Sequence, residues 1–249
     1  MSEAKPEFPS LSQPKVARPR SAPEARFGLL AWCCFPLVLG VGFGLAGPSA
    51  PALLIAAGGY GVGVWLATSL LRRGFDHPTL GACNAVTLVR LALTSALLAA
   101  VVTPVASGWV VCAVAAISLM LDGMDGWLAR REGLTSAFGA RFDMETDAAL
   151  ALILAGHVWM AGMTGPEILV LGLTRYVFVL GFLPFPWLSA PLPDRFGRKV
   201  VCVVQVAALI LLQVPNLPQG LAALIAWPAV AALVWSFGRD TLWLWRNRP

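Results

Sequence analysis

Residues 122–147 read DGMDGWLARREGLTSAFGARFDMETD and hold six of the 13 acidic residues of the chain. Asp122 and Asp125 are three residues apart, and Asp143 and Asp147 are four apart. Side chains at these spacings lie on one face of an α-helix. We expect the two helices to form a hairpin, so that the four carboxylates converge.

The residues around this segment are unusually apolar. Of 249 residues, 58% are hydrophobic and 12% are charged, and the mean hydropathy is +0.75. The charged fraction is about half that of an ordinary soluble domain. This composition excludes a water-soluble globule, a disordered chain and a disulfide-rich secreted scaffold, and it predicts an all-α, polytopic membrane protein.

Apolar runs of about 20 residues, long enough to span a membrane, recur along the chain. They predict eight spans, at 27–47, 51–71, 82–103, 106–130, 142–163, 167–187, 199–215 and 218–238. Residues 1–26 are polar and rich in Pro and Ser, and we expect them to form a disordered cytoplasmic tail. Residues 239–249 are expected to be a basic cytoplasmic tail.

The basic residues predict the orientation of the bundle. With a cytoplasmic N-terminus, every Lys and Arg outside the spans falls on the cytoplasmic side, and the opposite loops have none. The arrangement places both termini and the acidic segment at the cytoplasmic face, in an integral membrane protein that we assign to the cell inner membrane. The net charge of +5 is then explained by topology and anionic lipid, without nucleic acid.

Charged groups in a membrane are costly, which makes an acidic cluster a candidate functional site. Four converging carboxylates would repel one another, and a bound divalent cation would resolve that repulsion. All-oxygen ligands suit Mg²⁺, Mn²⁺ or Ca²⁺. With Arg130, Arg131 and Arg141 nearby, the segment has the parts of metal-assisted phosphoryl transfer. By contrast, the Gly-rich run 58–63 lies inside an apolar span and predicts close helix packing rather than a phosphate loop.

The segment resembles the signature of the CDP-alcohol phosphotransferase family, D-x2-D-G-x2-A-R-x8-G-x3-D-x3-D, at every specified position. The resemblance implies a six-helix core over residues 80–238, which leaves 27–72 as two additional transmembrane helices. It also implies transfer of a phosphatidyl group from a CDP-linked lipid, such as CDP-diacylglycerol, to an alcohol, with release of CMP in phospholipid biosynthesis. Members usually work as homodimers.

The resemblance further implies roles for individual residues. Two Mg²⁺ or Mn²⁺ ions would be held by Asp122, Asp125 and Asp143, with Asp147 completing the site and acting as general base on the acceptor hydroxyl. The sequence Asn84-x-x-Thr87-x-x-Arg90 resembles the start of the first core helix. The predicted CDP-binding residues are Asn84, Thr87, Asp122, Asp125, Gly126, Ala129, Arg130 and Gly139.

The acceptor alcohol is not identified by the sequence. Candidate contacts to the acceptor or to a phosphate are Arg90, Arg141, Arg175, Arg198 and Lys199. Arg175, near the middle of a predicted span, requires an anion. That anion is either a structural partner such as Glu145 or a phosphate on the acceptor.

Two other functions compete with this hypothesis. A membrane prenyltransferase also uses Asp-bound magnesium, although its acidic motifs usually lie far apart in the chain. A divalent-cation transporter would need acidic residues near the bilayer midplane and a path to both faces.

Overall fold

The computed structural model of the protein describes residues 21–75, 77, 79–103, 106–193 and 195–248. All regular secondary structure in these residues is helical, as the composition predicted. The α-helices are α1 (Ser21–Ala46), α2 (Ala50–Gly74), α3 (Ala82–Ala96), α4 (Leu98–Val101), α5 (Gly108–Glu132), α6 (Ala137–Met160), α7 (Leu169–Leu180), α8 (Phe196–Leu211) and α9 (Gln219–Arg246), with 3-10 turns η1 (Pro166–Ile168) and η2 (Pro186–Ser189).

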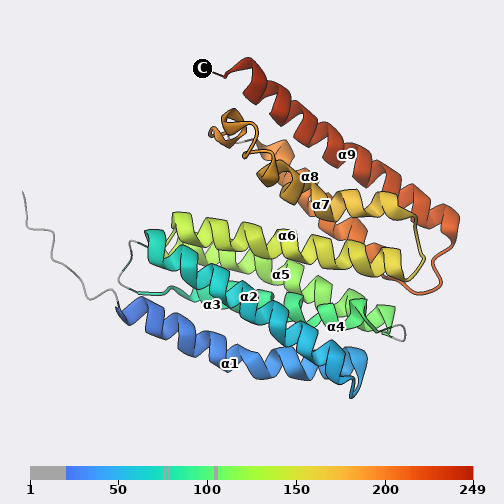
Figure 1. The fold of residues 1–249 in the computed structure, drawn as a ribbon, viewed down its shortest axis with the longest axis horizontal. Coiled ribbons are helices and arrows are strands. Elements are labelled where there is room, and N and C mark those ends of the chain that lie inside the picture. Colours follow the sequence, from blue (N-terminus) through green and yellow to red (C-terminus); the bar gives the residue numbers. More distant parts are fainter. Residues whose placement is uncertain (1–20, 76, 78, 104–105, 194, 249) are drawn as a thin grey trace, which may run out of the picture.

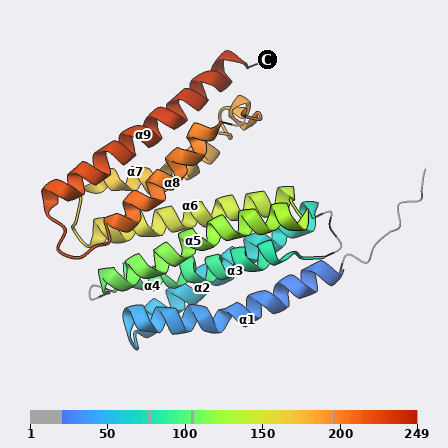
Figure 2. The ribbon, with the colours of Figure 1, turned by 180° about the vertical axis from the view of Figure 1, so that it is seen from behind.

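Successive long helices run antiparallel and form a bundle (Figure 1). Helix α3, with its short continuation α4, lies between the α1–α2 hairpin on one side and α5 and α6 on the other, as both views show (Figures 1 and 2). Helices α7, α8 and α9 form a second group beside α6. The start of α3, the end of α5 and the start of α6 lie at the same end of the bundle (Figure 1).

Five helical segments in the described residues are long and apolar enough to cross a membrane, so the protein is an integral membrane protein. They are Pro23–Ala46, Ala50–Arg73, Ala82–Val101, Gly108–Glu132 and Gln219–Arg246. The other three expected spans do not meet that standard. The charged residues of the acidic segment lower the hydropathy of the first half of α6. Helices α7 and α8 have only 12 and 16 residues. At 1.5 Å per residue, neither α7 nor α8 reaches across a hydrocarbon core of about 30 Å.

The ends of three helices differ from the sequence expectations. Helix α7 ends at Leu180, short of the expected 187, because Gly181 and the prolines at 184 and 186 follow it. Helix α1 already begins at Ser21, inside the predicted tail, whose residues 1–20 lie outside the described part. Helix α9 continues to Arg246, inside the predicted C-terminal tail.

The interior has two apolar clusters. The main core joins α3, α5, α6, α8 and α9, and what we call the hairpin core fills the space between α1–α2 and the back of α3. Two glycines of α2 allow the α1–α2 hairpin to approach α3 and α4 closely. A Cβ on Gly63 would lie 2.7 Å from Leu91 Cδ1, and a Cβ on Gly59 would collide with Leu98. The Gly-rich run is therefore a helix-packing surface, as predicted.

Candidate active site

A tight turn joins the two halves of the acidic segment. Helix α5 ends at Glu132, and the next residue, Gly133, adopts a left-handed conformation with φ of 65°, which favours glycine. Ser136 then caps α6, and its side-chain oxygen accepts a hydrogen bond from Gly139 N at 3.0 Å. These local signals reverse the chain and bring the end of α5 beside the start of α6.

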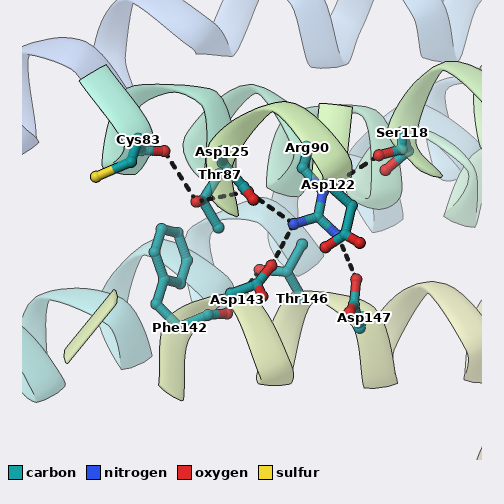
Figure 3. A network of polar contacts seen from close by, with 10 residues as sticks. All are labelled: Cys83, Thr87, Arg90, Ser118, Asp122, Asp125, Phe142, Asp143, Thr146 and Asp147. Carbon is teal, nitrogen blue, oxygen red and sulfur yellow. Dashed lines mark hydrogen bonds and ion pairs between the residues drawn. The ribbon is translucent and has the colours of Figure 1, made fainter. Parts of the chain in front are cut away.

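The four aspartates of the segment converge as the sequence predicted, and they surround one arginine (Figure 3). Arg90 of α3 is fully buried. Its Nη2 lies 3.0 Å from Asp122 Oδ1, and its Nη1 lies 2.9 Å from Asp125 Oδ2. The same guanidinium forms ion pairs with Asp143 and Asp147. Arg90 is therefore the shared partner of the cluster and does not lie on an open face, where an acceptor phosphate would meet it.

With all four carboxylates ionised, one guanidinium leaves three negative charges of this cluster unbalanced. Asp122, Asp143 and Asp147 each offer an oxygen within 4.8 Å of the other two. Their side chains are 29%, 36% and 40% exposed, whereas Asp125 is 6% exposed and also accepts a hydrogen bond from Thr87 Oγ1 at 3.1 Å. The donor set is all oxygen and carries excess negative charge, so it fits a hard divalent cation.

A pocket opens beside the aspartates, between the starts of α3 and α6 and the end of α5. Seven of the eight residues predicted to bind CDP line it, and only Asp122 does not: the seven are Asn84, Thr87, Asp125, Gly126, Ala129, Arg130 and Gly139. The pocket is also lined by residues that the sequence did not predict, including Cys83, Leu134, Thr135, Ser136 and Ala140. Of these, Ser136 had a sequence signal, since Ser before a helical run is typical of an N-cap.

The pocket contains an unsatisfied hydrogen-bond donor. Asn84 is buried, and its Nδ2 has no hydrogen-bond partner among the described residues. A buried donor without a partner costs about 1–3 kcal/mol. Close by, a Cβ on Gly139 would lie 3.3 Å from Asn84 Oδ1 and 3.2 Å from Ser136 Oγ. The glycine thus keeps the pocket open beside a donor that is free to bind a polar ligand.

A sequence model of one protein family, described as CDP-alcohol phosphatidyltransferase, matches residues 80–235 of the chain. The chain belongs to this family. The matched region runs from the start of α3 to within α9 and contains the four aspartates and the pocket. Neither the curated proteins nor the solved structures that were compared give a match.

Membership of the CDP-alcohol phosphatidyltransferase family supports transfer of a phosphatidyl group from a CDP-alcohol donor by a divalent-metal-dependent enzyme. The acidic cluster is where this chain could hold the metal. Membership also sets aside the prenyltransferase and transporter hypotheses.

The remaining predicted cations do not line the pocket. Arg175 of α7 pairs with Glu145 of α6 at 2.6 Å, which is the structural partner that the sequence offered. Arg198 pairs through Nε with Asp240 of α9 at 3.2 Å. Asp240 was not anticipated, since nothing in its local sequence pointed to Arg198. Arg141 and Lys199, the last two candidates, are exposed.

Proposed function

We propose that the protein transfers the phosphatidyl group of CDP-diacylglycerol to a small polar alcohol and releases CMP. The observation that carries the proposal is the junction of two features within one hairpin. A cluster of four aspartates with excess negative charge adjoins a pocket with a buried, unsatisfied amide donor. In a CDP-linked lipid, the nucleoside would bind in the pocket, and the diphosphate would lie beside the metal ions held by the aspartates.

The pocket is proposed to bind the cytidine diphosphate part of the donor. Gly126, Ala129 and Gly139 keep its wall small, so that a flat base or a ribose lies against the backbone. Asn84 and Thr87 supply an amide and a hydroxyl for hydrogen bonds, and the exposed Arg130 supplies charge for a phosphate oxygen.

The aspartates are proposed to hold two Mg²⁺ or Mn²⁺ ions, through Asp122, Asp125, Asp143 and Asp147. When bound, such ions would supply positive charge that stabilises the negative charge developing on the leaving CMP. Asp125 is mostly occupied by Arg90 and Thr87, so the three more exposed carboxylates are the stronger ligand candidates.

Asp147 is proposed to act as the general base. It is the most exposed of the four carboxylates and lies a full turn farther along α6 than Asp143, so an acceptor can reach it. Asp147 takes the proton of the acceptor hydroxyl as that oxygen attacks the phosphorus that carries the lipid. The new oxygen–phosphorus bond forms, the bond to the bridging oxygen breaks, and CMP leaves with that oxygen.

The ion pairs of α7 and α8 favour an acceptor without a phosphate. Arg175 and Arg198 are partly buried cations on these helices, and each is already paired with a carboxylate, Glu145 or Asp240. A phosphorylated acceptor would have to displace one of these carboxylates or rely on the exposed Arg141 and Lys199. A neutral or zwitterionic alcohol would require neither the displacement of a carboxylate nor an additional cation.

The membrane arrangement is proposed from the basic residues. Lys and Arg concentrate at the end of the bundle that carries the acidic cluster, which we take to be cytoplasmic, together with both termini, in the cell inner membrane. The lipid part of the donor would then enter from the bilayer and the acceptor from the cytoplasm. As the family resemblance implies, we also propose a homodimer, which light scattering of the detergent-solubilised protein tests.

The reaction is tested by CMP release from CDP-diacylglycerol in lipid micelles with Mg²⁺ or Mn²⁺. Alcohols are supplied one at a time in matched pairs, such as glycerol with glycerol 3-phosphate and inositol with inositol phosphate. We expect metal-dependent release with an unphosphorylated member of a pair. Release only with phosphorylated acceptors would contradict the acceptor proposal, and no release with any acceptor would contradict the proposed reaction.

A further inference from the structure

The α1–α2 hairpin lies outside the family-matched region, yet one of its side chains packs directly on a helix of the active site. Phe27, near the start of α1, is fully buried. Its ring lies edge-on to two rings of α6, with centroids 6.2 Å from Phe138 and 5.9 Å from Phe142. Phe138 and Phe142 stack on each other at 5.7 Å. Phe75, which follows α2, packs against Phe138 at 5.6 Å.

The two rings of α6 are adjacent in sequence to residues that line the pocket. Gly139 follows Phe138 and Asp143 follows Phe142, each about 100° farther around the helix. Gly139 and Asp143 therefore face the pocket while the two rings face the hairpin. A rotation of α6 about its axis would move both sets together.

The pocket has little room for such a movement. At Gly139, α6 approaches α3 so closely that an added Cβ would lie 3.3 Å from Asn84 Oδ1. Densely packed interiors transmit small displacements instead of absorbing them. The rotational setting of α6 therefore fixes the width of the pocket between Asn84 and Gly139, and it also fixes the direction of Asp143.

We propose that Phe27 is a positioning residue for donor binding: by packing on Phe138 and Phe142, it sets the orientation in which α6 presents Gly139 and Asp143 to the nucleotide. The inference rests on the proposed function, because it takes the pocket to bind CDP. It gives the additional N-terminal helices a task in the reaction beyond insertion in the membrane.

Phe35 offers a matched control on the same helix. Its ring packs against Trp32 at 6.0 Å and Tyr60 at 6.3 Å, within the hairpin and away from the pocket. Phe35→Ala therefore removes an aromatic side chain of α1 from the same hairpin core but leaves the rings of α6 in place. Phe27→Ala removes the contact to α6, and Phe27→Leu keeps much of the apolar volume without the ring.

The test measures the binding of CDP in the presence of MgCl₂ by titration calorimetry on the full chain in lipid nanodiscs, together with unfolding temperatures. We expect Phe27→Ala to weaken CDP binding about tenfold, since small misplacements of site residues have effects of at least this size. Phe27→Leu should weaken it less, and Phe35→Ala should leave it within about twofold of wild type even where its unfolding temperature falls as far. In CMP release, the donor KM should rise, and kcat should fall as well, because Asp143 is a proposed metal ligand and loses its orientation together with Gly139.

Two results would overturn the proposal: CDP binding by Phe27→Ala equal to that of wild type, or equal weakening by Phe27→Ala and Phe35→Ala. If Phe27→Ala does not fold, Phe27→Leu and Phe138→Leu probe the same contact from its two sides, and unchanged CDP binding in both would overturn the proposal equally. Failure of the wild-type protein to bind CDP would instead contradict the proposed function itself, and the role of Phe27 with it.

Discussion

Two buried polar networks lie at opposite ends of α6, and they differ in whether their hydrogen-bonding and charge requirements are met. Near the end of α6, His157 Nδ1 lies 2.7 Å from Gln213 Oε1, and Gln213 Nε2 donates to Leu154 O at 3.1 Å. Both ends of the Gln213 amide are thus paired, and the network carries no charged residue. It ties α6 to the segment after α8.

The network at the start of α6 is not balanced. Arg90 is shared by four carboxylates, three of which remain partly exposed, and the nearby Asn84 amide donor has no partner in the part of the chain that the structure describes. Burying polar groups without satisfying them costs stability. The His157 network is thus satisfied within the protein, whereas the Arg90 network retains excess charge and an unsatisfied donor, which the proposed cations and a polar ligand would satisfy.

The largest effect is expected when the cation shared by the four aspartates, Arg90, is removed. Arg90→Ala should lower the free energy of unfolding by about 3–5 kcal/mol, because it leaves uncompensated charges in the interior. Mg²⁺ should recover part of this loss, since the ion would neutralise the same carboxylates. Thermal unfolding with and without MgCl₂ measures both effects. Arg131→Ala serves as the control, because Arg131 is exposed and only stacks on Trp127. A variant whose unfolding temperature ignores Mg²⁺ would count against the metal site.

Removal of one proposed metal ligand is the next largest change. Asp143→Asn should lower kcat by about 100-fold or more, because a catalytic metal contributes several kcal/mol of charge stabilisation. The concentration of Mg²⁺ needed for half-maximal activity should rise as well. CMP release measured over a series of Mg²⁺ concentrations checks both points. An unchanged Mg²⁺ dependence would remove Asp143 from the ligand set.

Substitutions in the His157–Gln213 network should lower stability and leave CDP binding unchanged. His157→Phe leaves Gln213 Oε1 without its donor and should cost about 1–3 kcal/mol of unfolding free energy. The double variant His157→Phe, Gln213→Leu should recover part of this cost, because both polar partners are then gone. CDP binding should stay at the wild-type level in both variants. Loss of CDP binding in the double variant would show that the two ends of α6 are coupled.

The smallest change concerns the unpaired amide. Asn84→Ala should weaken CDP binding about tenfold through the loss of a hydrogen bond to the ligand. It should not lower the unfolding temperature, since no protein hydrogen bond of the Asn84 amide nitrogen is lost. Thr94→Val is the control on the same helix, because the Thr94 hydroxyl is also buried and unpaired but lies outside the pocket. Equal CDP binding by wild type and Asn84→Ala would mean that the amide does not contact the nucleotide.

Features that depend on spacing within one or two helices were predictable from sequence. The α5–α6 hairpin, the convergence of the four aspartates and the packing role of Gly59 and Gly63 all follow from helical periodicity. The predicted residues that line the pocket follow instead from the family resemblance, and other lining residues, such as Cys83 and Ala140, are not specified by the family motif.

Contacts between side chains that lie far apart in the sequence were not predictable. Arg90 had been grouped with acceptor contacts, and only the packing of α3 between α5 and the hairpin brings it among the aspartates. The pairing of Arg198 with Asp240 joins helices that meet only in the folded bundle. Helix α7 is shorter than the expected span 167–187, because apolar composition continues beyond Leu180, where the helix ends.

In the proposed function, the aspartate cluster catalyses phosphatidyl transfer, and Asp147 is the base. The most direct measurement compares wild type with Asp147→Asn in two assays, CMP release from CDP-diacylglycerol with the best acceptor and Mg²⁺-dependent CDP binding. Loss of a general base should lower kcat by about 10²–10⁴-fold, while CDP binding remains within a few-fold of wild type. Near-normal CMP release by Asp147→Asn would mean that Asp147 is not the general base.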